Sequence, residues 1–322
     1  MRYRIEYMHS TIQLGKSDLR VPPLGVGTWQ WGEDLIWGFG NSYDRKAAEA
    51  AFSASVAAGL TFFDTAEVYG RGGSERVLGA CVKTTDKPVI IASKFAPLPQ
   101  RIGRRTVTHA LDESLKRLGV ACIDLYQVHW PFPVISIEML MDILADAVDA
   151  GKIRYIGVSN YSAVDMRRAH AALAKRGLPL ACNQVRYSLL NRTPEVNGVY
   201  AACRELDIAL IAYSPLAQGM LTGRYSPDNP PPGPRRFMPN FNRAALEHME
   251  PVTQALRRIG AAHGDKTPAQ VALNWLARQP GVLPIPGAKN AKHAEANAGA
   301  IGWDMTDDEA DLLSSVSLSW RK

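Results

Sequence analysis

The stretch "TFFDTAEVYG", residues 61–70, begins as a β-strand and ends as a loop. Its first three residues favour extended structure, and the apolar run stops at Asp64. Tyr69 follows in the loop, which a glycine closes. A short apolar strand with polar residues at its carboxyl end recurs along the chain, and this repetition predicts the fold.

Eight β-favouring runs occur along the chain, at 24–29, 61–64, 88–94, 123–129, 153–159, 180–185, 208–214 and 282–287. Helical patterns lie between them, with apolar residues at three- and four-residue spacing and a terminal glycine, as in 45–59 and 106–119. Strands that alternate with helices pair in parallel, and eight such units close into a barrel. The alternative is a doubly wound open sheet, but neither G-x-G-x-x-G nor a Walker A sequence occurs. We therefore expect an α/β fold, a (β/α)8 TIM barrel.

Three segments are expected to add to the barrel. Residues 11–25 predict a β-hairpin with its turn at "GKSD", placed to plug one end of the barrel. Residues 215–242 form a long, proline-rich loop after the seventh strand, for which a functional lid is favoured over an unstructured insertion. Residues 305–320 predict a final capped helix. No linker divides the chain, so one domain is expected over 1–322.

The composition is typical of a globular protein, with 46% hydrophobic and 21% charged residues. The apolar runs are too short for a membrane helix, and no apolar segment of secretory length follows the basic N-terminus. We expect a cytoplasmic protein, or one of a plastid or another organelle where a transit segment has been removed.

The spacing of the cysteines and the distribution of charge indicate which kinds of ligand the protein is expected to bind. Cys81, Cys122, Cys182 and Cys203 lack the spacing of a metal site and are expected to be reduced core residues. The net charge of +6 comes from scattered basic residues without a Lys/Arg run, which argues against nucleic-acid binding. A phosphorylated small ligand agrees with this charge.

Polar side chains gather at the carboxyl ends of the predicted strands, which face the active-site mouth in a TIM barrel. They are Asp64 with Tyr69, Lys94, His129, Ser159 with Asn160, Gln184, and Tyr213 with Ser214. Each alone has an ordinary structural explanation, because an Asp can cap a turn, a Lys can extend into solvent and a His can pack. Together they are chemically complementary and are expected to meet at one mouth.

Four of these residues can form a tuned proton donor. A free phenol has a pKa of about 10 and is a poor acid near neutrality. The Lys94 ammonium is expected to lower the pKa of Tyr69, and Asp64 to keep that ammonium charged. His129 would then orient a substrate oxygen.

Other reaction classes lack their signatures. The histidines show no H-x-x-x-H or H-x-H spacing, and no G-x-S-x-G sequence occurs, so neither a metal site nor a nucleophile elbow is indicated. A proton donor without either one indicates reduction, with hydride from a bound cofactor.

At these residues the chain resembles the aldo-keto reductase superfamily, over nearly its whole length. The matching motifs are, in order, "FFDTAEVYG" with a following "SE", "SKF", "DLYQVHW", "GVSNY", "NQVRYSLL", "AYSPLAQGML" and "PIPGAKN" with a later Asn. So many ordered motifs are very specific. "ACNQVRYSLLNR" and "PIPGAKNAKHAEANAGAIGW" are most similar to plant and cyanobacterial-type reductases, near the branch that includes pyridoxal reductases.

The resemblance implies an NADPH-dependent (β/α)8 reductase with Asp64, Tyr69, Lys94 and His129 as its catalytic tetrad. It implies that the cofactor is held by Thr28, Trp29, Asp64, Ser159, Asn160, Gln184, Tyr213, Ser214, Leu216, Gln218, Arg224, Gly287, Lys289, His293 and Asn297, with Arg235 as a further contact. In this arrangement Ser159, Asn160 and Gln184 hold the nicotinamide carboxamide, and Tyr213 stacks beneath the ring. The segment from Ser214 to Arg224 follows the pyrophosphate.

The resemblance also places the adenosine end on "GAKNAKHAEAN", residues 287–297. Lys289 occupies the position that reads the 2′-phosphate, which favours NADPH over NADH; the alternative is an ordinary lysine at a helix start. His293 and Ala296 depart from the Gln and Glu of many relatives, so the adenine contacts at these two positions are open. Glu295 precedes Ala296 but points about 100° away from it around the helix, so it is not expected to replace the Glu of the relatives.

The expected activity is therefore reduction of an aldehyde or ketone, with no metal. Trp29, Tyr69, Phe95 and Trp130 are expected to line the substrate pocket, and Trp31 and Trp37 to add to an aromatic mouth. Aromatic carbonyl compounds such as pyridoxal are among the expected substrates. The alternative is a cofactor-binding regulatory subunit of the kind that serves potassium channels, but the complete tetrad favours an enzyme.

Overall fold

The strands form a single curled sheet. A computed structural model describes residues 11–34, 38–41, 43–132, 134–231, 236 and 239–322, so that Trp37 and Arg235 lie outside the described residues. The eight parallel strands are ordered β10-β9-β8-β7-β6-β5-β4-β3. They are β3 (Val26–Gly27), β4 (Phe62–Asp64), β5 (Ile90–Phe95), β6 (Ile123–Val128), β7 (Ile153–Ser159), β8 (Leu180–Arg186), β9 (Ala209–Tyr213) and β10 (Val282–Pro284). All eight predicted strands are confirmed.

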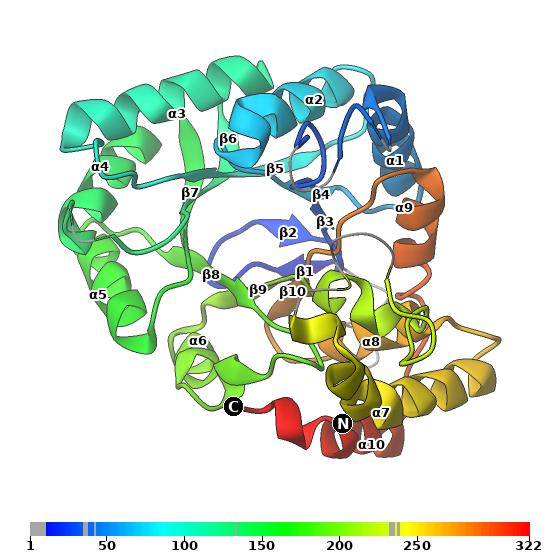
Figure 1. The fold of residues 1–322 in the computed structure, drawn as a ribbon. Helices are drawn as coiled ribbons and strands as arrows, with labels where there is room; N and C mark the ends of the chain where they lie inside the picture. The colour runs from blue at the N-terminus through cyan, green and yellow to red at the C-terminus, as the bar shows by residue number, and fades with distance from the viewer. Residues whose placement is uncertain (1–10, 35–37, 42, 133, 232–235, 237–238) are drawn as a thin grey trace.

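Backbone hydrogen bonds join the first strand of the sheet to the last. Gly25 N donates to Pro284 O over 2.9 Å, and Gly27 N donates to Pro286 O over 3.0 Å. A parallel bridge between Gly27 and Gly287 continues this pairing. The strands therefore curl into the predicted (β/α)8 barrel, with the helices outside them (Figure 1).

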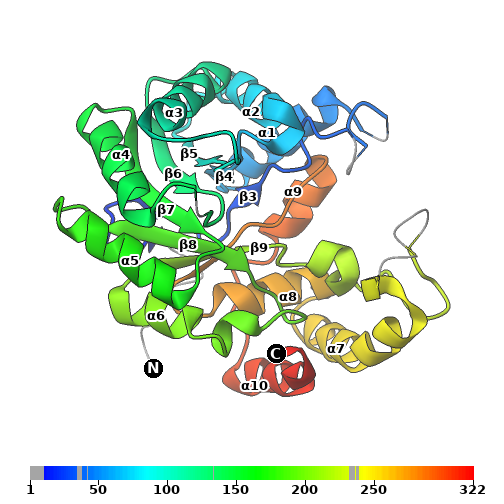
Figure 2. The same ribbon diagram turned by 60° about the vertical axis from the view of Figure 1, so that its left-hand side comes forward.

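The helices alternate with the strands along the chain. They are α1 (Arg45–Ala57), α2 (Gly73–Val82), α3 (Arg104–Leu118), α4 (Ile137–Asp149), α5 (Ala163–Ala174), α6 (Val199–Leu206), α7 (Arg243–Ala262), α8 (Pro268–Ala277), α9 (Ala291–Ala298) and α10 (Asp307–Val316). Capping boxes at Thr267 and Thr306 fix the starts of α8 and α10. The predicted final helix, α10, packs beside α7 outside the ring of strands (Figure 2).

The N-terminal hairpin closes the amino-terminal end of the barrel, as the sequence predicted. Strands β1 (Ile12–Gln13) and β2 (Arg20–Val21) pair antiparallel. Leu14 and Leu19 are buried in one cluster with Phe62, Leu125 and Leu283, which belong to the barrel strands. Because this end is filled with apolar side chains, the carboxyl ends of the strands are left for a site.

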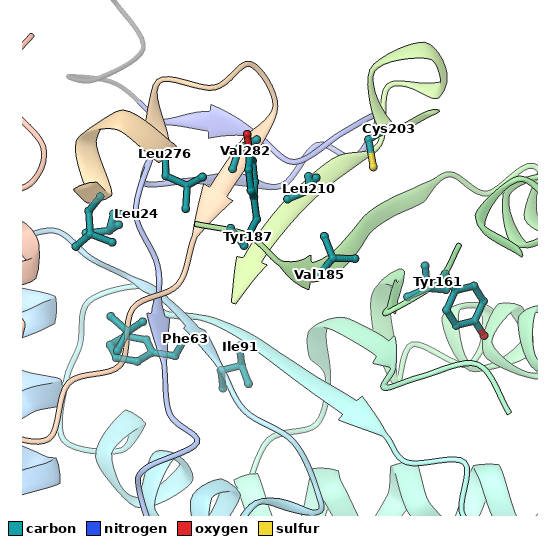
Figure 3. Packing of buried hydrophobic residues seen from close by; sticks show 14 of the residues in the cluster. Leu24, Phe63, Ile91, Tyr161, Val185, Tyr187, Cys203, Leu210, Leu276 and Val282 are labelled. Atoms are coloured by element: carbon teal, nitrogen blue, oxygen red, sulfur yellow. The ribbon is translucent and has the colours of Figure 1, made fainter. Parts of the chain in front are cut away.

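A second apolar layer lies between the strands and the surrounding helices. It contains Phe63, Ile91 and Leu210 from the strands, and Leu276 of α8 beside Val282 of β10 (Figure 3). Neighbouring residues of a strand point to opposite faces, so Phe62 enters the inner cluster while Phe63 enters this outer one. The strand that ends at Asp64 is thus fixed on both faces.

The loop after β4 depends on a glycine. Gly70 has a φ of 55°, and a Cβ there would lie 1.9 Å from the carbonyl oxygen of Gly32. The Gly70 N–H donates to Glu33 Oε2 over 3.1 Å, which ties this loop to the one after β3. Tyr69 is thereby placed against Trp29, with ring centroids 5.9 Å apart.

Candidate active site

The carboxyl ends of the strands open into a cavity of about 610 Å³ that extends to α9. The cavity is lined by most of the site residues predicted from the sequence: Thr28, Trp29, Asp64, Tyr69, His129, Trp130, Ser159, Asn160, Gln184, Tyr213, Ser214, Leu216, Gln218, Arg224, Gly287, Lys289, His293 and Asn297. Residues scattered over the whole sequence therefore meet in one space.

Lys94 and Asp64 form a buried ion pair beneath this cavity. Lys94 is 0% exposed and Asp64 is 2% exposed. The Lys94 ammonium donates to the Asp64 carboxylate and, over 2.8 Å, to Thr65 O. Burial by itself lowers the pKa of Lys94, but Asp64 and Tyr69 outweigh it and hold that pKa above its usual value. Lys94 therefore keeps its positive charge out of contact with solvent.

Two glutamine side chains fix the other carboxylate oxygen of Asp64. Gln127 Nε2 donates to Asp64 Oδ2 over 3.0 Å, and Gln184 Nε2 donates to the same oxygen over 2.8 Å. Gln184 Nε2 also lies 3.2 Å from Gln127 Oε1, so the two amides support each other. All three side chains are at most 2% exposed. The carboxylate is held in one orientation, with one oxygen toward Lys94.

Tyr69 stands over this ion pair from the loop after β4. Lys94 Nζ lies 5.1 Å from the centroid of its ring, and the His129 ring packs edge-on at 5.6 Å. Burial raises the pKa of Tyr69, and the Lys94 charge opposes that rise without cancelling it. The sequence predicted a lowered pKa; the result differs because burial of the phenol outweighs the ammonium. Tyr69 accordingly keeps its proton at neutral pH.

His129 faces Tyr69 from the end of β6. Burial, followed by the charge of Lys94, lowers the pKa of His129 to about 3, so the ring is neutral at physiological pH. Its Nδ1 is buried and has no hydrogen-bond partner among the described residues. Its backbone carbonyl accepts from Asn160 Nδ2 over 3.0 Å, which anchors the segment.

The opposite wall combines polar groups with an aromatic ring. Tyr213 Oη donates to Asn160 Oδ1 over 3.1 Å, and Asn160 Nδ2 donates to Ser159 Oγ over 3.1 Å. Ser159 Oγ in turn donates to Gln184 O over 2.9 Å. Gln184 uses its side-chain nitrogen on Asp64, which leaves Oε1 as its acceptor for a ligand. This wall can hold a flat ring that carries a polar substituent.

The segment after β9 has an unusual backbone. Ser214, Ala217, Gln218 and Gly219 have φ values of 52°, 47°, 56° and 96°. Left-handed conformations cost non-glycine residues about 1–2 kcal/mol each, and they cluster at ligand sites. Backbone N–H groups arranged in this way form concave sites for anions. This part of the predicted lid lines the cavity; its closure remains a prediction.

Basic side chains surround the far end of the cavity. Arg224, Lys289, Lys292 and His293 all line it. Burial, followed by the charges of these three cations, lowers the pKa of His293. Lys289 Nζ also lies 4.6 Å from the centroid of the Tyr43 ring. The concentration of positive charge favours an anionic ligand group here.

Two predicted aromatic contacts do not reach the cavity. Phe95 is 0% exposed and packs in the outer layer, with the Arg101 guanidinium 5.4 Å from its ring centroid. It follows Lys94 in β5, and adjacent strand residues face opposite ways. Trp31 is also 0% exposed, and its Nε1 donates to Ala288 O over 2.7 Å. Of the aromatic residues predicted to line the substrate pocket, Trp29, Tyr69 and Trp130 do line the cavity.

Several site residues were missed by the sequence reasoning. Gln30, Tyr225, Thr267 and Lys292 line the cavity, and Gln127 lies in the network beneath it. Lys292 had a signal, because it lies three residues after Lys289 in the same basic segment. Gln127 had one also, since it precedes His129 by two residues and shares its face of the strand.

Comparison with known proteins decides the family. The model described as "Aldo/keto reductase family" matches residues 23–317. The chain belongs to the aldo/keto reductase family. The expectation drawn from the sequence motifs is confirmed.

Curated members of the aldo/keto reductase family align over most of the chain. The chloroplastic pyridoxal reductase of Arabidopsis thaliana is 39% identical over 90% of this chain and 82% of its own length. The Schizosaccharomyces pombe protein named "Aldo-keto reductase yakc [NADP(+)]" is 38% identical over 89% of this chain and 86% of its own. The Arabidopsis relative agrees with the predicted similarity to the branch that includes pyridoxal reductases.

Solved structures of the family agree in fold. An aldo-keto reductase from Klebsiella pneumoniae in complex with NADPH has a TM-score of 0.75 and 30% identity, covering 97% of this chain and 96% of its own. The thermostable aldo-keto reductase Tm1743 in complex with epalrestat has a TM-score of 0.76 and 29% identity, covering 95% and 99% of the two chains.

Other expectations concern metals, membranes and cysteines. The described residues contain no group of three or more His, Cys, Asp or Glu side chains that could hold a metal ion. No helix in the described part of the chain is both long and apolar enough to cross a membrane. All four cysteines are free; Cys81, Cys182 and Cys203 are buried, and Cys122 is partly so.

The network beneath the cavity predicts a role for Gln127 in carbonyl reduction, the general reaction of the family. Gln127→Leu removes one donor from Asp64, so the carboxylate can turn away from Lys94. We expect kcat to fall about tenfold, because hydrogen bonds to charged groups contribute about 1.5–3 kcal/mol. Gln254→Leu, at an exposed position on α7, is the matched control. Equal kcat values for the two variants would contradict the positioning role.

Proposed function

We propose that the protein reduces an aldehyde or ketone to an alcohol with NADPH, and that Tyr69 is the general acid. The observation that carries this proposal is the position of the Tyr69 phenol, above the buried Lys94–Asp64 pair and at the floor of a cavity that ends in basic residues. A proton donor and a site for a phosphorylated cofactor thus share one space.

The chemistry of the cavity fits NADPH. The Tyr213 ring and the polar groups around Asn160 suit a nicotinamide with its carboxamide. The segment from Ser214 to Gly219 lines the cavity and contains several left-handed residues, a backbone form that suits a pyrophosphate. The basic side chains of Lys289, Arg224 and Lys292 suit the 2′-phosphate at the adenosine end of NADPH. The names of the Klebsiella and Schizosaccharomyces relatives, which include NADPH and NADP(+), support the same cofactor.

Tyr69, Lys94 and Asp64 would carry out the proton transfer. The bound cofactor would supply hydride to the carbonyl carbon. Tyr69 Oη would give its proton to the carbonyl oxygen as negative charge develops there. The phenolate that remains is stabilised by Lys94, whose charge is maintained by Asp64. The raised pKa of Tyr69 keeps the phenol protonated before reaction. The Lys94 ammonium then stabilises the negative charge that forms on Tyr69 when the proton is transferred.

His129 would orient the substrate without adding charge. With a pKa of about 3 the ring is neutral, so it can donate one hydrogen bond but cannot serve as an imidazolium. Its buried, unpartnered Nδ1 favours the tautomer that carries the proton on Nε2. That N–H would hold the carbonyl oxygen beside Tyr69, with the Trp29 and Trp130 rings excluding water.

The aromatic lining indicates the substrate class. Trp29, Trp130 and Tyr69 offer flat apolar surfaces, which suit an aromatic aldehyde or ketone. The Arabidopsis relative is named a pyridoxal reductase, which makes pyridoxal a suitable first substrate.

The acid assignment predicts the effect of Tyr69→Phe. Loss of the phenolic proton should lower kcat with a good aldehyde by about 10²–10⁴-fold, the usual contribution of a general acid. NADPH affinity should change little, because the hydroxyl is not assigned to the cofactor. Tyr200→Phe, on α6, is the matched control, since its hydroxyl donates to Pro280 O and the residue does not line the cavity.

Two outcomes would redirect the proposal. Wild-type turnover in Tyr69→Phe would remove Tyr69 as the acid. A single oxidation of bound NADPH by the wild-type protein, followed by very slow release, would favour the alternative regulatory subunit, whereas repeated turnover favours the enzyme.

Lys289 is predicted to select NADPH. Lys289→Ala should raise the dissociation constant of NADPH about tenfold, because one charged contact to the 2′-phosphate is lost. The dissociation constant of NADH should stay the same. Lys175→Ala, at an exposed position after α5, should change neither. Fluorescence titration of both cofactors gives the comparison, and an unchanged NADPH/NADH ratio in Lys289→Ala would refute the assignment.

His293 is predicted to couple NADPH binding to proton uptake. In the ligand-free protein burial and then the adjacent cations lower its pKa, and a 2′-phosphate would neutralise those cations and raise it. A pKa raised by the ligand adds affinity that is complete below the free-state pKa and is lost as pH rises through the bound-state pKa. The preference for NADPH over NADH should therefore increase as pH falls from about 8 to about 6.5.

Calorimetry in buffers of different ionisation enthalpy measures this proton directly. We expect uptake on binding of NADPH, none on binding of NADH, and a smaller uptake for NADPH in His293→Gln. Equal proton uptake by the wild type and His293→Gln would exclude His293 as the titrating group.

A further inference from the structure

A second cavity, of about 390 Å³, opens beside the first at the carboxyl ends of β7, β8 and β9. Asn160 and Tyr213 line both cavities, so they form the wall between them. The hydrogen bond from Tyr213 Oη to Asn160 Oδ1 closes that wall. Nothing in the proposed reduction uses the second cavity.

Arg186 brings a positive charge to this cavity. It is the last residue of β8 and stands in register with Tyr213 of β9, so both side chains lie on the same face of the sheet. Arg186 is partly buried, and its guanidinium makes no hydrogen bond or ion pair with the described residues. Burial raises the pKa of Tyr213 and the charge of Arg186 opposes the rise, as expected for close neighbours.

The other polar side chains of the cavity add donors. Asn191, Thr193 and Asn197 line it. Asn197 Oδ1 already accepts from Val199 N over 3.1 Å, which leaves the Nδ2 group as a donor. Among the described residues of the lining there is no aspartate or glutamate. A guanidinium with amide and hydroxyl donors, and without a carboxylate, is the chemistry of an anion site.

The glutamate of the adjoining loop is already paired with other residues. Glu195 lies in the same loop, but it pairs with Arg192 over 2.7 Å and with Arg321 over 3.1 Å. Arg192 is in addition bound to Ser314 O and is only 6% exposed. The loop therefore satisfies one arginine completely and leaves Arg186, at the cavity, without a counter-charge from the described residues.

We propose that this cavity is an anion subsite, in which Arg186 binds a carboxylate or a phosphate monoester beside the Tyr213 ring. The anion is either a separate small molecule or the charged end of a carbonyl substrate that reaches over the wall. In both cases an anionic group binds at Arg186. It neutralises the guanidinium charge beside the Tyr213 ring, on which the nicotinamide is proposed to stack. The inference goes beyond the proposed reduction, and only its link to substrate rests on that function.

The first experiment asks whether a free anion binds. The protein is saturated with NADPH, so that the basic end of the main cavity is occupied, and is titrated with inorganic phosphate and, separately, with succinate. Calorimetry should show saturable binding to the wild type and to Arg105→Gln, an exposed position on α3. Binding should be about tenfold weaker or more in Arg186→Gln and partly restored in Arg186→Lys, since one charged hydrogen bond contributes about 1.5–3 kcal/mol.

The second experiment asks whether the anion belongs to the substrate. The variants are compared on 4-carboxybenzaldehyde and on its methyl ester, which lacks the charge. If the substrate supplies the anion, Arg186→Gln raises KM for the acid only and leaves kcat unchanged. If a free anion is the ligand, phosphate changes the kinetics of both aldehydes alike, and only when Arg186 is present.

The two experiments separate this inference from the proposed function. Anion binding that depends on Arg186 supports the subsite even if neither aldehyde is reduced. Identical behaviour of Arg186→Gln and Arg105→Gln in both experiments, with both variants folded by thermal unfolding, would overturn it whether or not the protein is a reductase.

Discussion

The buried ion pair between Lys94 and Asp64 is the interaction on which the barrel mouth depends. A charge removed from water is costly unless it is paired and fully hydrogen-bonded. Lys94 meets this requirement with Asp64 and Thr65 O, and Asp64 meets it with Gln127 and Gln184. Strands β4, β5, β6 and β8 therefore contribute to one polar network. This network fixes the floor on which Tyr69 rests.

Burial and one fixed charge give neighbouring groups different protonation behaviour. Burial favours the neutral forms of both Tyr69 and His129, so it raises the pKa of the first and lowers that of the second. Lys94 lowers both values: at Tyr69 its charge opposes burial without outweighing it, and at His129 it adds to the effect of burial. The result is a protonated phenol beside a neutral imidazole. The apolar plug at the opposite end of the barrel confines this polar arrangement to the carboxyl ends of the strands.

The sequence predicted regular elements and strand-end residues well, and contacts across the mouth less well. The eight strands and the hairpin followed from local patterns of apolar residues and turns, which depend on neighbours in the chain. Phe95 was expected to add to an aromatic pocket, yet alternation along β5 turns it into the outer layer. The strand face that Gln127 shares with His129 was a signal, but the role of Gln127 depends on Asp64, which comes from another strand. The direction of the Tyr69 pKa shift depends on how deeply the phenol is buried, and burial cannot be known from the sequence alone.

The sequence by itself determined the barrel, its family and the residue types at each strand end, because periodicity and motif order are properties of the linear chain. Only the tertiary structure decided which side chains share a space. It brought Gln127 and Gln184 to Asp64 and Lys292 to the basic end of the cavity, and it left Arg186 beside a separate cavity. The physical reason is that hydrogen bonds, burial and electrostatic fields act over a few ångströms in space, whereas these residues lie far apart in the chain.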